Sequence, residues 1–190
     1  MKITSAQFIK GFVHPEDIAS ETLPQYAFIG RSNVGKSSLI NTLTKIKGLA
    51  KTSSFPGHTQ EINFFLINKK FHLVDLPGYG FARVSVQHRE KISHLIKGYL
   101  FGDFPQLKKI VLMVDGVVGP TTDDIEMLDA LRTTGKEIII AVNKVDKIKK
   151  SEQKKQLGKI QDIMKGHVLV PISATKRTGV GELVEQVFQY

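Results

Sequence analysis

The sequence predicts an α/β fold with a mostly parallel sheet of six or seven strands, one antiparallel strand and helices on both faces. Apolar runs alternate with helix-like segments along almost the whole chain, which is typical of a parallel sheet covered on both sides. One pair of neighbouring runs is joined by a turn short enough for a hairpin. The 190 residues, of which 41% are hydrophobic, are enough to build one such domain with a core.

Apolar runs mark the expected strands. They are Tyr26–Ile29, Ile62–Ile67, Phe71–Val74, Ile110–Val114, Ile138–Val142 and Val168–Ile172, the last weakened by Pro171. The tripeptide Asn68-Lys69-Lys70 joins the second and third runs and favours a hairpin. The hairpin implies one antiparallel strand, expected at an edge of the sheet. Met1–Phe12 could add another edge strand.

Apolar residues at helical spacing mark the expected helices. They are Leu39, Ile40 and Leu43; Ile92, Leu95, Ile96 and Tyr99; Ile125, Leu128 and Leu131; Leu157, Ile160 and Met164. Gly181–Phe188 is expected to be a closing helix. Thr121 or Thr122 can cap the third helix, whose first turn holds Asp123 and Asp124, and Ser151 can cap the fourth. The stretch 45–60 has no clear period and is a candidate mobile loop.

Composition excludes several classes of protein. The chain has no cysteine, so disulfide scaffolds, cysteine nucleophiles and thiolate metal sites are excluded. No apolar run reaches the length of about 18 residues that a membrane span needs. The N-terminus lacks the pattern of a secretory signal. We therefore expect a cytoplasmic protein without a membrane partner.

Basic residues are concentrated in one region. The formal net charge is +9, and the region from Lys144 to Arg177 contains 10 basic and 3 acidic residues. A local basic face indicates a polyanionic partner, because binding to nucleic acid releases counterions. The alternative is a solvated, lysine-rich helix at 151–165, and the charge pattern alone leaves both open.

The segment Gly30-Arg-Ser-Asn-Val-Gly-Lys-Ser37 matches the phosphate-loop pattern G-x-x-x-x-G-K-[ST]. It follows a predicted strand and opens a predicted helix, which is the context that the motif requires. Its amides and the helix N-terminus are expected to face phosphate oxygens. Lys36 is expected to reach the β- and γ-phosphates, and the Ser37 hydroxyl to ligate Mg²⁺.

Three further motifs follow predicted strands. Asp75-Leu-Pro-Gly78 can hold Mg²⁺ through a water and bring an amide to the γ-phosphate. Asn143-Lys-Val-Asp146 can read guanine, because a carboxylate accepts two hydrogen bonds from guanine that adenine cannot donate. A backbone amide of Ser173-Ala174 can donate to guanine O6. Each motif alone is weak, but all lie at carboxyl ends of strands, where open α/β sheets bind ligands.

The sequence resembles a translation-factor-class P-loop GTPase, and specifically the EngB family, also called YihA or YsxC. The motifs that carry the resemblance are, in order, GRSNVGKSSLIN, SSFPGHTQ, DLPGYGFA, NKVD and ISA. The resemblance covers nearly the whole chain, with residues 25–190 as the G domain and 1–24 as an N-terminal extension. It implies a GTP-driven switch in assembly of the large ribosomal subunit, with rRNA as partner of the basic region and effects on growth, cell division and septation.

The resemblance also implies the site residues. Pro56-Gly57-His58-Thr59 would be the first switch, with Thr59 as second Mg²⁺ hydroxyl and γ-phosphate sensor, and Asp75–Gly78 would start the second. Metal ligands would be Ser37, Thr59 and Asp75, and Lys36, Thr59, Gly78 and Asn33 would act in catalysis. The full set of expected nucleotide-binding residues is Gly30, Arg31, Ser32, Asn33, Val34, Gly35, Lys36, Ser37, Ser38, Gly57, His58, Thr59, Gln60, Glu61, Asp75, Leu76, Pro77, Gly78, Asn143, Lys144, Val145, Asp146, Ser173 and Ala174.

The catalytic machinery has one gap. Tyr79 follows Gly78, where Ras-like proteins have a water-positioning glutamine, so we expect slow intrinsic hydrolysis that a partner or an ion assists. Asn33 resembles the asparagine that helps to bind K⁺ in potassium-activated GTPases, although it could simply tolerate a strained loop conformation. Arg31 and Arg83 could stabilise charge in cis, but we expect them to bind phosphate or form ion pairs. His58 could touch the phosphates or a partner, but we expect it to face solvent.

The sequence is compatible with more than one environment for two aromatic residues and with more than one function. Tyr79 and Phe81 could be exposed partner contacts or could pack inside. A second functional class is a nucleotide-holding, rRNA-binding module with little turnover, which the missing glutamine favours. A P-loop kinase or ATPase is a third, against which Asn143–Asp146 argues. A monomer is expected.

Overall fold

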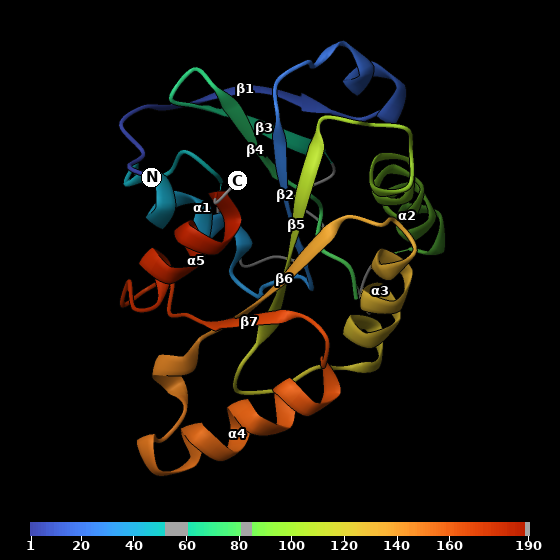
Figure 1. The fold of residues 1–190 in the computed structure, drawn as a ribbon. Helices are drawn as coiled ribbons and strands as arrows, with labels where there is room; N and C mark the ends of the chain where they lie inside the picture. Colours follow the sequence, from blue (N-terminus) through green and yellow to red (C-terminus); the bar gives the residue numbers. More distant parts are fainter. Residues whose placement is uncertain (52–60, 81–84, 189–190) are drawn as a thin grey trace.

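The computed structural model describes residues 1–51, 61–80 and 85–188, and in this part of the chain it has a seven-stranded sheet between two layers of helices (Figure 1). The strand order is β1-β3-β4-β2-β5-β6-β7. The strands are β1 Ala6–Phe12, β2 Gln25–Gly30, β3 Ile62–Ile67, β4 Phe71–Asp75, β5 Leu107–Asp115, β6 Glu137–Asn143 and β7 Val168–Pro171. This confirms the predicted fold class and all six predicted strands.

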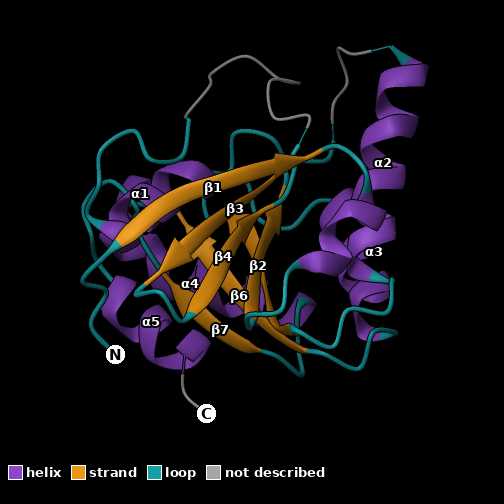
Figure 2. Cartoon of the chain, turned by 90° about the horizontal axis from the view of Figure 1, so that it is seen from above, coloured by secondary structure: helices purple, strands orange, loops and turns teal. Residues whose placement is uncertain are grey.

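Helices cover both faces of the sheet, with α1 and α5 on one side and α2 and α3 on the other (Figures 1 and 2). Their bounds are α1 Lys36–Thr44, α2 Val86–Leu100, α3 Thr122–Arg132, α4 Lys150–Ile163 and α5 Val180–Phe188, with short 3₁₀ helices η1 at Pro15–Ser20 and η2 at Val145–Lys147. Helix α4 lies beside the β6–β7 end of the sheet. Among the described residues, no helix has the length and apolar character needed to span a bilayer.

The antiparallel strand is β3, and it does not lie at the edge. It pairs antiparallel with β4 on one side and with β1 on the other. The expected edge position was therefore wrong, because the N-terminal strand occupies it. The hairpin itself is confirmed: Asn68 and Lys69 have φ of 51° and 56°, and the Lys70 amide donates to the Ile67 carbonyl at 2.9 Å. The β1–β3 register shifts between Phe8 and Lys10.

The core has two halves because alternate residues of each strand point to opposite faces. In β5, Ile110, Leu112 and Val114 belong to the half under α2 and α3. Val111 and Met113 belong to the half under α1 and α5. Burial on both faces explains why this strand has an unbroken apolar sequence.

Two details of the predicted helices are corrected. Ile125 is 39% exposed, because α3 turns Asp124, Leu128 and Leu131 toward the core instead. Thr121 is the N-cap of α3, as expected. Ser151 does not cap α4: Lys149 is the N-cap, and its carbonyl accepts the amides of Glu152 and Gln153 at 2.8 and 3.0 Å. At the start of α4 a backbone carbonyl therefore accepts these amides, and among the described residues no side-chain cap is present.

The orientation of α3 predicts very different costs for two truncations. Leu128→Ala removes a side chain that is 2% exposed and leaves a cavity, so it should lower the free energy of unfolding by about 2–5 kcal/mol. Ile125→Ala, the matched control on the same helix, should cost less than about 1 kcal/mol. Urea unfolding measures both. Equal costs would contradict the inward positions assigned to α3.

Candidate functional site

The phosphate-loop motif forms the turn between β2 and α1. Gly30 is the last residue of β2 and Lys36 the first of α1. Gly35 has a φ of 106°, and a Cβ there would lie 2.4 Å from Nδ2 of Asn143, so both backbone conformation and space require glycine. Asn33 is exposed, and its φ of 62° lies in the left-handed region. This conformation agrees with the interpretation that Asn33 is present because asparagine tolerates a strained loop.

Lys36, Ser37 and Asp75 meet inside the loop. Lys36 Nζ donates to the Gly30 carbonyl at 3.1 Å, and the Ser37 hydroxyl donates to Oδ2 of Asp75 at 3.0 Å. Burial lowers the pKa of Lys36, which the charge of Asp75 opposes. Burial also raises the pKa of Asp75, which Lys36 and the Ser37 hydrogen bond oppose. Two charged groups are thus held away from water at one point.

The donor set fits Mg²⁺. Oδ1 of Asp75 is buried and has no hydrogen-bond partner among the described residues, while the Ser37 hydroxyl lies against the other oxygen. Within the described ranges, no group of three or more His, Asp or Glu side chains could hold a metal by itself. Mg²⁺ commonly binds through one or two protein oxygens, with phosphate and water completing its octahedron. This pair of side chains suits that mode.

Gly78 packs directly against the phosphate loop. A Cβ on Gly78 would lie 2.8 Å from the Ser32 nitrogen and 3.2 Å from Lys36 Nζ. The Ser32 amide donates to the Tyr79 carbonyl at 3.0 Å, and Arg31 and Tyr79 form an isolated parallel bridge. The start of the predicted second switch is therefore attached to the loop by backbone contacts.

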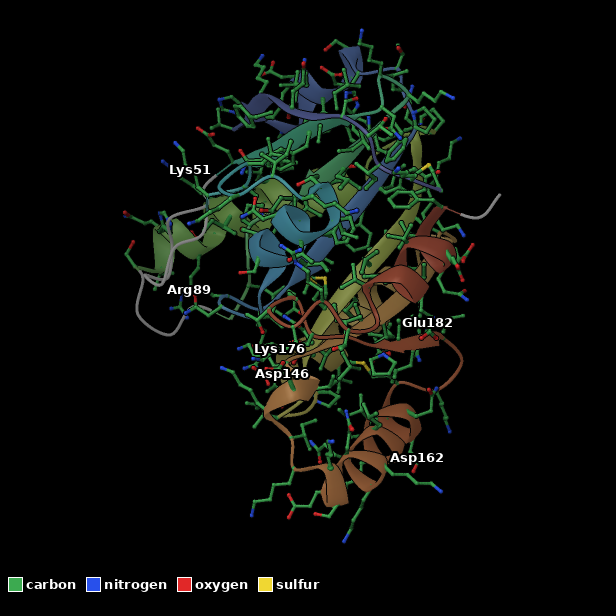
Figure 3. The ribbon with its side chains drawn as sticks, turned by 90° about the vertical axis from the view of Figure 1, so that its left-hand side faces the viewer. Lys51, Arg89, Asp146, Asp162, Lys176 and Glu182 are labelled. Carbon is green, nitrogen blue, oxygen red and sulfur yellow. The ribbon has the colours of Figure 1, made fainter. Side chains whose placement is uncertain are left out.

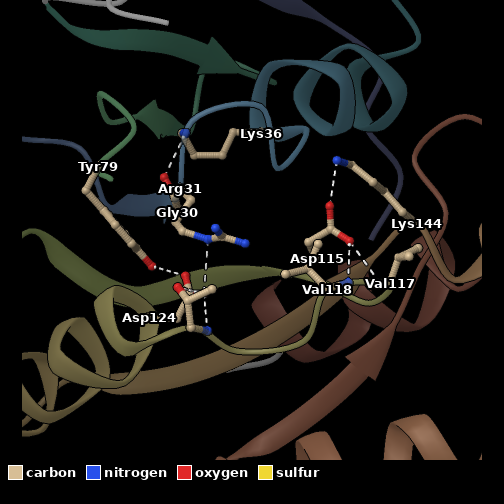
Figure 4. Close-up of polar contacts among 10 residues, drawn as sticks. Gly30, Arg31, Lys36, Tyr79, Asp115, Val117, Val118, Asp124 and Lys144 are labelled. Carbon is tan, nitrogen blue, oxygen red and sulfur yellow. Dashed lines mark hydrogen bonds and ion pairs between the residues drawn. The ribbon is translucent and has the colours of Figure 1, made fainter. Parts of the chain in front are cut away.

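The Tyr79 side chain points away from the phosphate loop, toward the N-terminus of α3 (Figure 4). Its hydroxyl donates to Oδ1 of Asp124 at 2.7 Å, and burial together with that carboxylate raises its pKa well above the usual range. Tyr79 packs against the core rather than standing free as a partner contact. Tyr79 therefore attaches the segment after β4 to α3.

Asp124 is the shared partner of three segments. It is fully buried, and its Oδ2 accepts the amide and the hydroxyl of Thr121, both at 2.8 Å. The Arg31 Nε lies 3.2 Å from the same oxygen, an ion pair that confirms the ion-paired interpretation of this arginine. One carboxylate thus joins the phosphate loop, the segment after β4 and the cap of α3.

Asn143 joins two other segments. Its Nδ2 donates to the Val34 carbonyl at 2.8 Å, and its Oδ1 accepts the Ala174 amide at 3.0 Å. The Ser173 amide donates to the Thr178 carbonyl at 2.9 Å, so both predicted O6 donors have protein partners in this structure. The Asn143 side chain holds the phosphate loop and the loop after β7 at a fixed separation.

Lys144 bridges to a residue that sequence reasoning missed. Its Nζ donates to the Asn33 carbonyl at 2.9 Å and to Oδ2 of Asp115 at 2.7 Å. Asp115 ends β5, directly after a buried apolar run, as Asp75 ends β4. That shared position was the available signal. Asp146 lies in η2 with an exposed carboxylate that has no hydrogen bond or ion pair among the described residues (Figure 3).

These contacts bring the four predicted motifs together at the carboxyl edge of the sheet. Leu76, Pro77, Val34 and Val145 are buried beneath them, and Ser38 continues α1. Glu61 is exposed. Other predicted residues lie outside the described ranges, so the structure leaves their predictions untested: they are Pro56, Gly57, His58, Thr59, Gln60, Phe81 and Arg83.

Known proteins with related sequences decide the family. The model of the 50S ribosome-binding GTPase family matches residues 25–144. A "Probable GTP-binding protein EngB" of Clostridium perfringens is 44% identical over 99% of this chain and 96% of that protein. The chain belongs to the EngB family of GTP-binding proteins.

Further comparisons agree with membership of the EngB family. An EngB protein of Halothermothrix orenii is 49% identical over 82% of this chain and 78% of its own length. The elongation factor Tu GTP-binding domain model matches residues 99–190. A crystal structure of a probable GTP-binding protein EngB superposes with a TM-score of 0.72 at 28% identity, covering 86% of this chain and 96% of that one. As a member of this GTPase family, the chain is a GTP-hydrolysing enzyme that binds guanine nucleotides.

A structure of Era with MgGDPNP and a segment of 16S ribosomal RNA is also similar. Its TM-score is 0.69 at 25% identity, covering 87% of this chain and 55% of that one.

The contacts of Asp124 predict its contribution to stability. Asp124→Asn removes a charge that Arg31, Tyr79 and the α3 cap share, and should lower the free energy of unfolding by about 2–3 kcal/mol. Asp123→Asn, the neighbouring exposed carboxylate, loses only a helix-dipole interaction worth about 0.3–1 kcal/mol. Urea unfolding at neutral pH compares the two variants. A cost for Asp124→Asn no larger than that of its neighbour would contradict the assignment.

Proposed function

We propose that this protein is a slowly hydrolysing GTP switch that acts in assembly of the large ribosomal subunit in the cytoplasm. Growth, cell division and septation then depend on it through ribosome supply. The observation that carries the proposal is the convergence of the four motifs, with Lys36, Ser37 and Asp75 gathered inside the phosphate loop. The match to a family described as ribosome-binding GTPases supports the choice of partner.

A few groups have distinct roles around the phosphates of the nucleotide. Lys36 and the loop amides bind the β- and γ-phosphates, where Lys36 stabilises the charge that develops as water attacks in line. Ser37 and Asp75, with Thr59, hold Mg²⁺, which supplies positive charge to the phosphate oxygens when bound. Gly78 brings its amide to the γ-phosphate, and its close packing on Ser32 supports this role. Loss of the γ-phosphate releases the contacts of Thr59 and Gly78 and changes partner affinity.

The guanine end rests on Asp146, whose exposed carboxylate accepts N1–H and N2–H₂ of the base. Lys144 covers the base with its stem, and Asn143 positions both neighbouring loops.

Asp146→Asn tests the base assignment. An amide presents one acceptor and one donor, so the variant should lose affinity for GTP and gain affinity for xanthosine triphosphate, which carries an oxygen where guanine has N2. Competition binding against a fluorescent guanine nucleotide measures the ratio. Asp162→Asn, an exposed carboxylate on α4, is the control and should leave the ratio unchanged. Full guanine preference in Asp146→Asn would refute the assignment.

The partner surface is the basic region from Lys144 to Arg177. All its basic residues except Lys144 are exposed, and within the described ranges none of those exposed side chains forms an ion pair. A surface hollow of about 410 Å³ between α4 and η2 is lined by four lysines and one acidic residue, namely Lys147, Lys149, Lys155, Lys159 and Glu152. A cluster of unpaired ammonium groups favours the phosphates of rRNA over plain solvation.

Co-sedimentation with large ribosomal particles tests this surface. Lys155→Glu with Lys159→Glu should weaken binding at low salt and reduce the steepness of its salt dependence, because each phosphate contact releases counterions. Lys69→Glu with Lys70→Glu, in the exposed hairpin turn, is the control with the same change of charge. Runs with GDP, a GTP analogue and no nucleotide reveal the switch. Equal effects of the two pairs would argue for a solvated helix.

A second candidate is a module that holds guanine nucleotide and binds rRNA with little turnover. The observation that favours it is Tyr79, whose hydroxyl is bound by Asp124 and is not available to orient water. Single-turnover hydrolysis with and without ribosomal particles separates the two functions. Acceleration supports the switch, and its absence under every condition supports the module.

The role of Asn33 has a separate test. If Asn33 helps to bind K⁺, single-turnover hydrolysis should be faster in K⁺ than in Na⁺ at equal ionic strength, and Asn33→Ala should abolish the difference. Equal rates in the two salts would contradict K⁺ binding. The role of Asn33 would then be to adopt the left-handed conformation of the loop.

A further inference from the structure

Asp115 lies outside the motifs named above, yet its side chain contacts Lys144 of the predicted guanine motif. It is the last residue of β5, and its Oδ1 accepts the amides of Val117 and Val118 at 2.9 and 3.3 Å. These bonds fix the carboxylate against its own loop. Its other oxygen, Oδ2, lies 2.7 Å from Nζ of Lys144 (Figure 4). The carboxylate is therefore a fixed acceptor for a lysine in the loop that follows β6, the neighbouring strand of the sheet.

Lys144 is held at both ends. Its backbone has a φ of 67°, and its Nζ donates to the Asn33 carbonyl at 2.9 Å as well as to Asp115. A lysine side chain loses conformational entropy when it is immobilised. A carbonyl gives one hydrogen bond, whereas the carboxylate adds a charge-assisted bond that offsets this loss. Both side chains are largely shielded from water, with exposures of 27% for Lys144 and 11% for Asp115.

The ammonium group thus connects three loops. They are the phosphate loop at Asn33, the loop after β5 at Asp115 and the loop after β6 at Lys144. A nucleotide that spans the phosphate loop and the guanine loop needs their separation to be set before it arrives. Preorganisation of this kind improves affinity because less ordering remains to be done on binding.

We propose that Asp115 is a positioning residue for guanine-nucleotide binding, which acts by orienting Lys144 so that the phosphate loop and the guanine loop are held in one arrangement. The inference rests on the proposed function and assigns it a determinant outside the recognised motifs. Asp115 touches neither base nor phosphate in this role. Its removal should affect retention of the nucleotide and leave the chemical step alone.

The test compares Asp115→Asn with Asp129→Asn. The amide of Asp115→Asn keeps an oxygen for the loop amides but loses the charge that holds Lys144. Asp129 also forms an ion pair at 2.7 Å, with Arg132, but on the exposed face of α3. Titration with GDP and stopped-flow release of a fluorescent GDP give affinity and dissociation rate. Single-turnover hydrolysis at saturating GTP gives the chemical step.

Asp115→Asn should weaken GDP binding about tenfold through faster dissociation, with the single-turnover rate within about twofold of wild type. Asp129→Asn should match wild type in all three measurements. Lys144→Met, which keeps the apolar stem, should also weaken binding, and adding Asp115→Asn to it should cause no further loss. Asp115→Glu keeps the charge but displaces it, and should fall between wild type and Asp115→Asn.

Several results would overturn the proposal. They are unchanged GDP dissociation in Asp115→Asn, additive losses in the double variant, or a loss of affinity that follows only from a lower midpoint of urea unfolding. If Asp115→Asn does not fold, Asp115→Glu decides by the same measurements. Failure of the wild-type protein to bind GDP would instead overturn the proposed function itself.

Discussion

The buried carboxamide of Asn143 is the contact on which the geometry of the site depends. It donates to the Val34 carbonyl and accepts the Ala174 amide, so one planar group sets the spacing between the phosphate loop and the loop after β7. Both bonds are buried, where an unmatched donor or acceptor costs more than the bond itself contributes. The glycine at position 35 belongs to the same constraint, since any larger residue would displace the Asn143 amide. The positions of the phosphate loop and of the loop after β7 are therefore coupled through one side chain.

Lys36 and Asp75 place opposite charges in a buried part of the site. Burial alone moves the pKa of Lys36 down and that of Asp75 up, toward the neutral forms of both. Their mutual attraction opposes that shift, but Oδ1 of Asp75 still has no hydrogen-bond donor among the residues that the structure describes. By contrast, Asp124 has donors on both oxygens and serves the architecture. Asp124, whose two oxygens both accept hydrogen bonds, has a structural role. Asp75, which has one oxygen without a donor among the described residues, is the carboxylate that we propose to act on a ligand.

Local patterns predicted most of this molecule, and long-range partners explain the rest. The strands, the hairpin and the phosphate loop depend on neighbouring residues, so composition and spacing revealed them. Ile125 was misplaced because the inward face of α3 contains Asp124, a residue that periodicity assigns to solvent. Its burial is made possible by Tyr79 and Arg31, which lie far away in the sequence. Asp115 was missed for the same reason, since its partner Lys144 lies far along the chain, in the loop after β6. The first-switch residues 56–59 stay predictions.

The irregular edge strand β1 affects how this protein associates with other chains. An open strand edge presents free amides and carbonyls that can recruit a strand from another chain. Here β1 leaves Phe8 and Ile9 exposed at that border, which would favour such recruitment. The register shift between Phe8 and Lys10 interrupts the regular ladder, and the lysine places a charge beside it. Together they act against pairing of this edge with a strand of another chain.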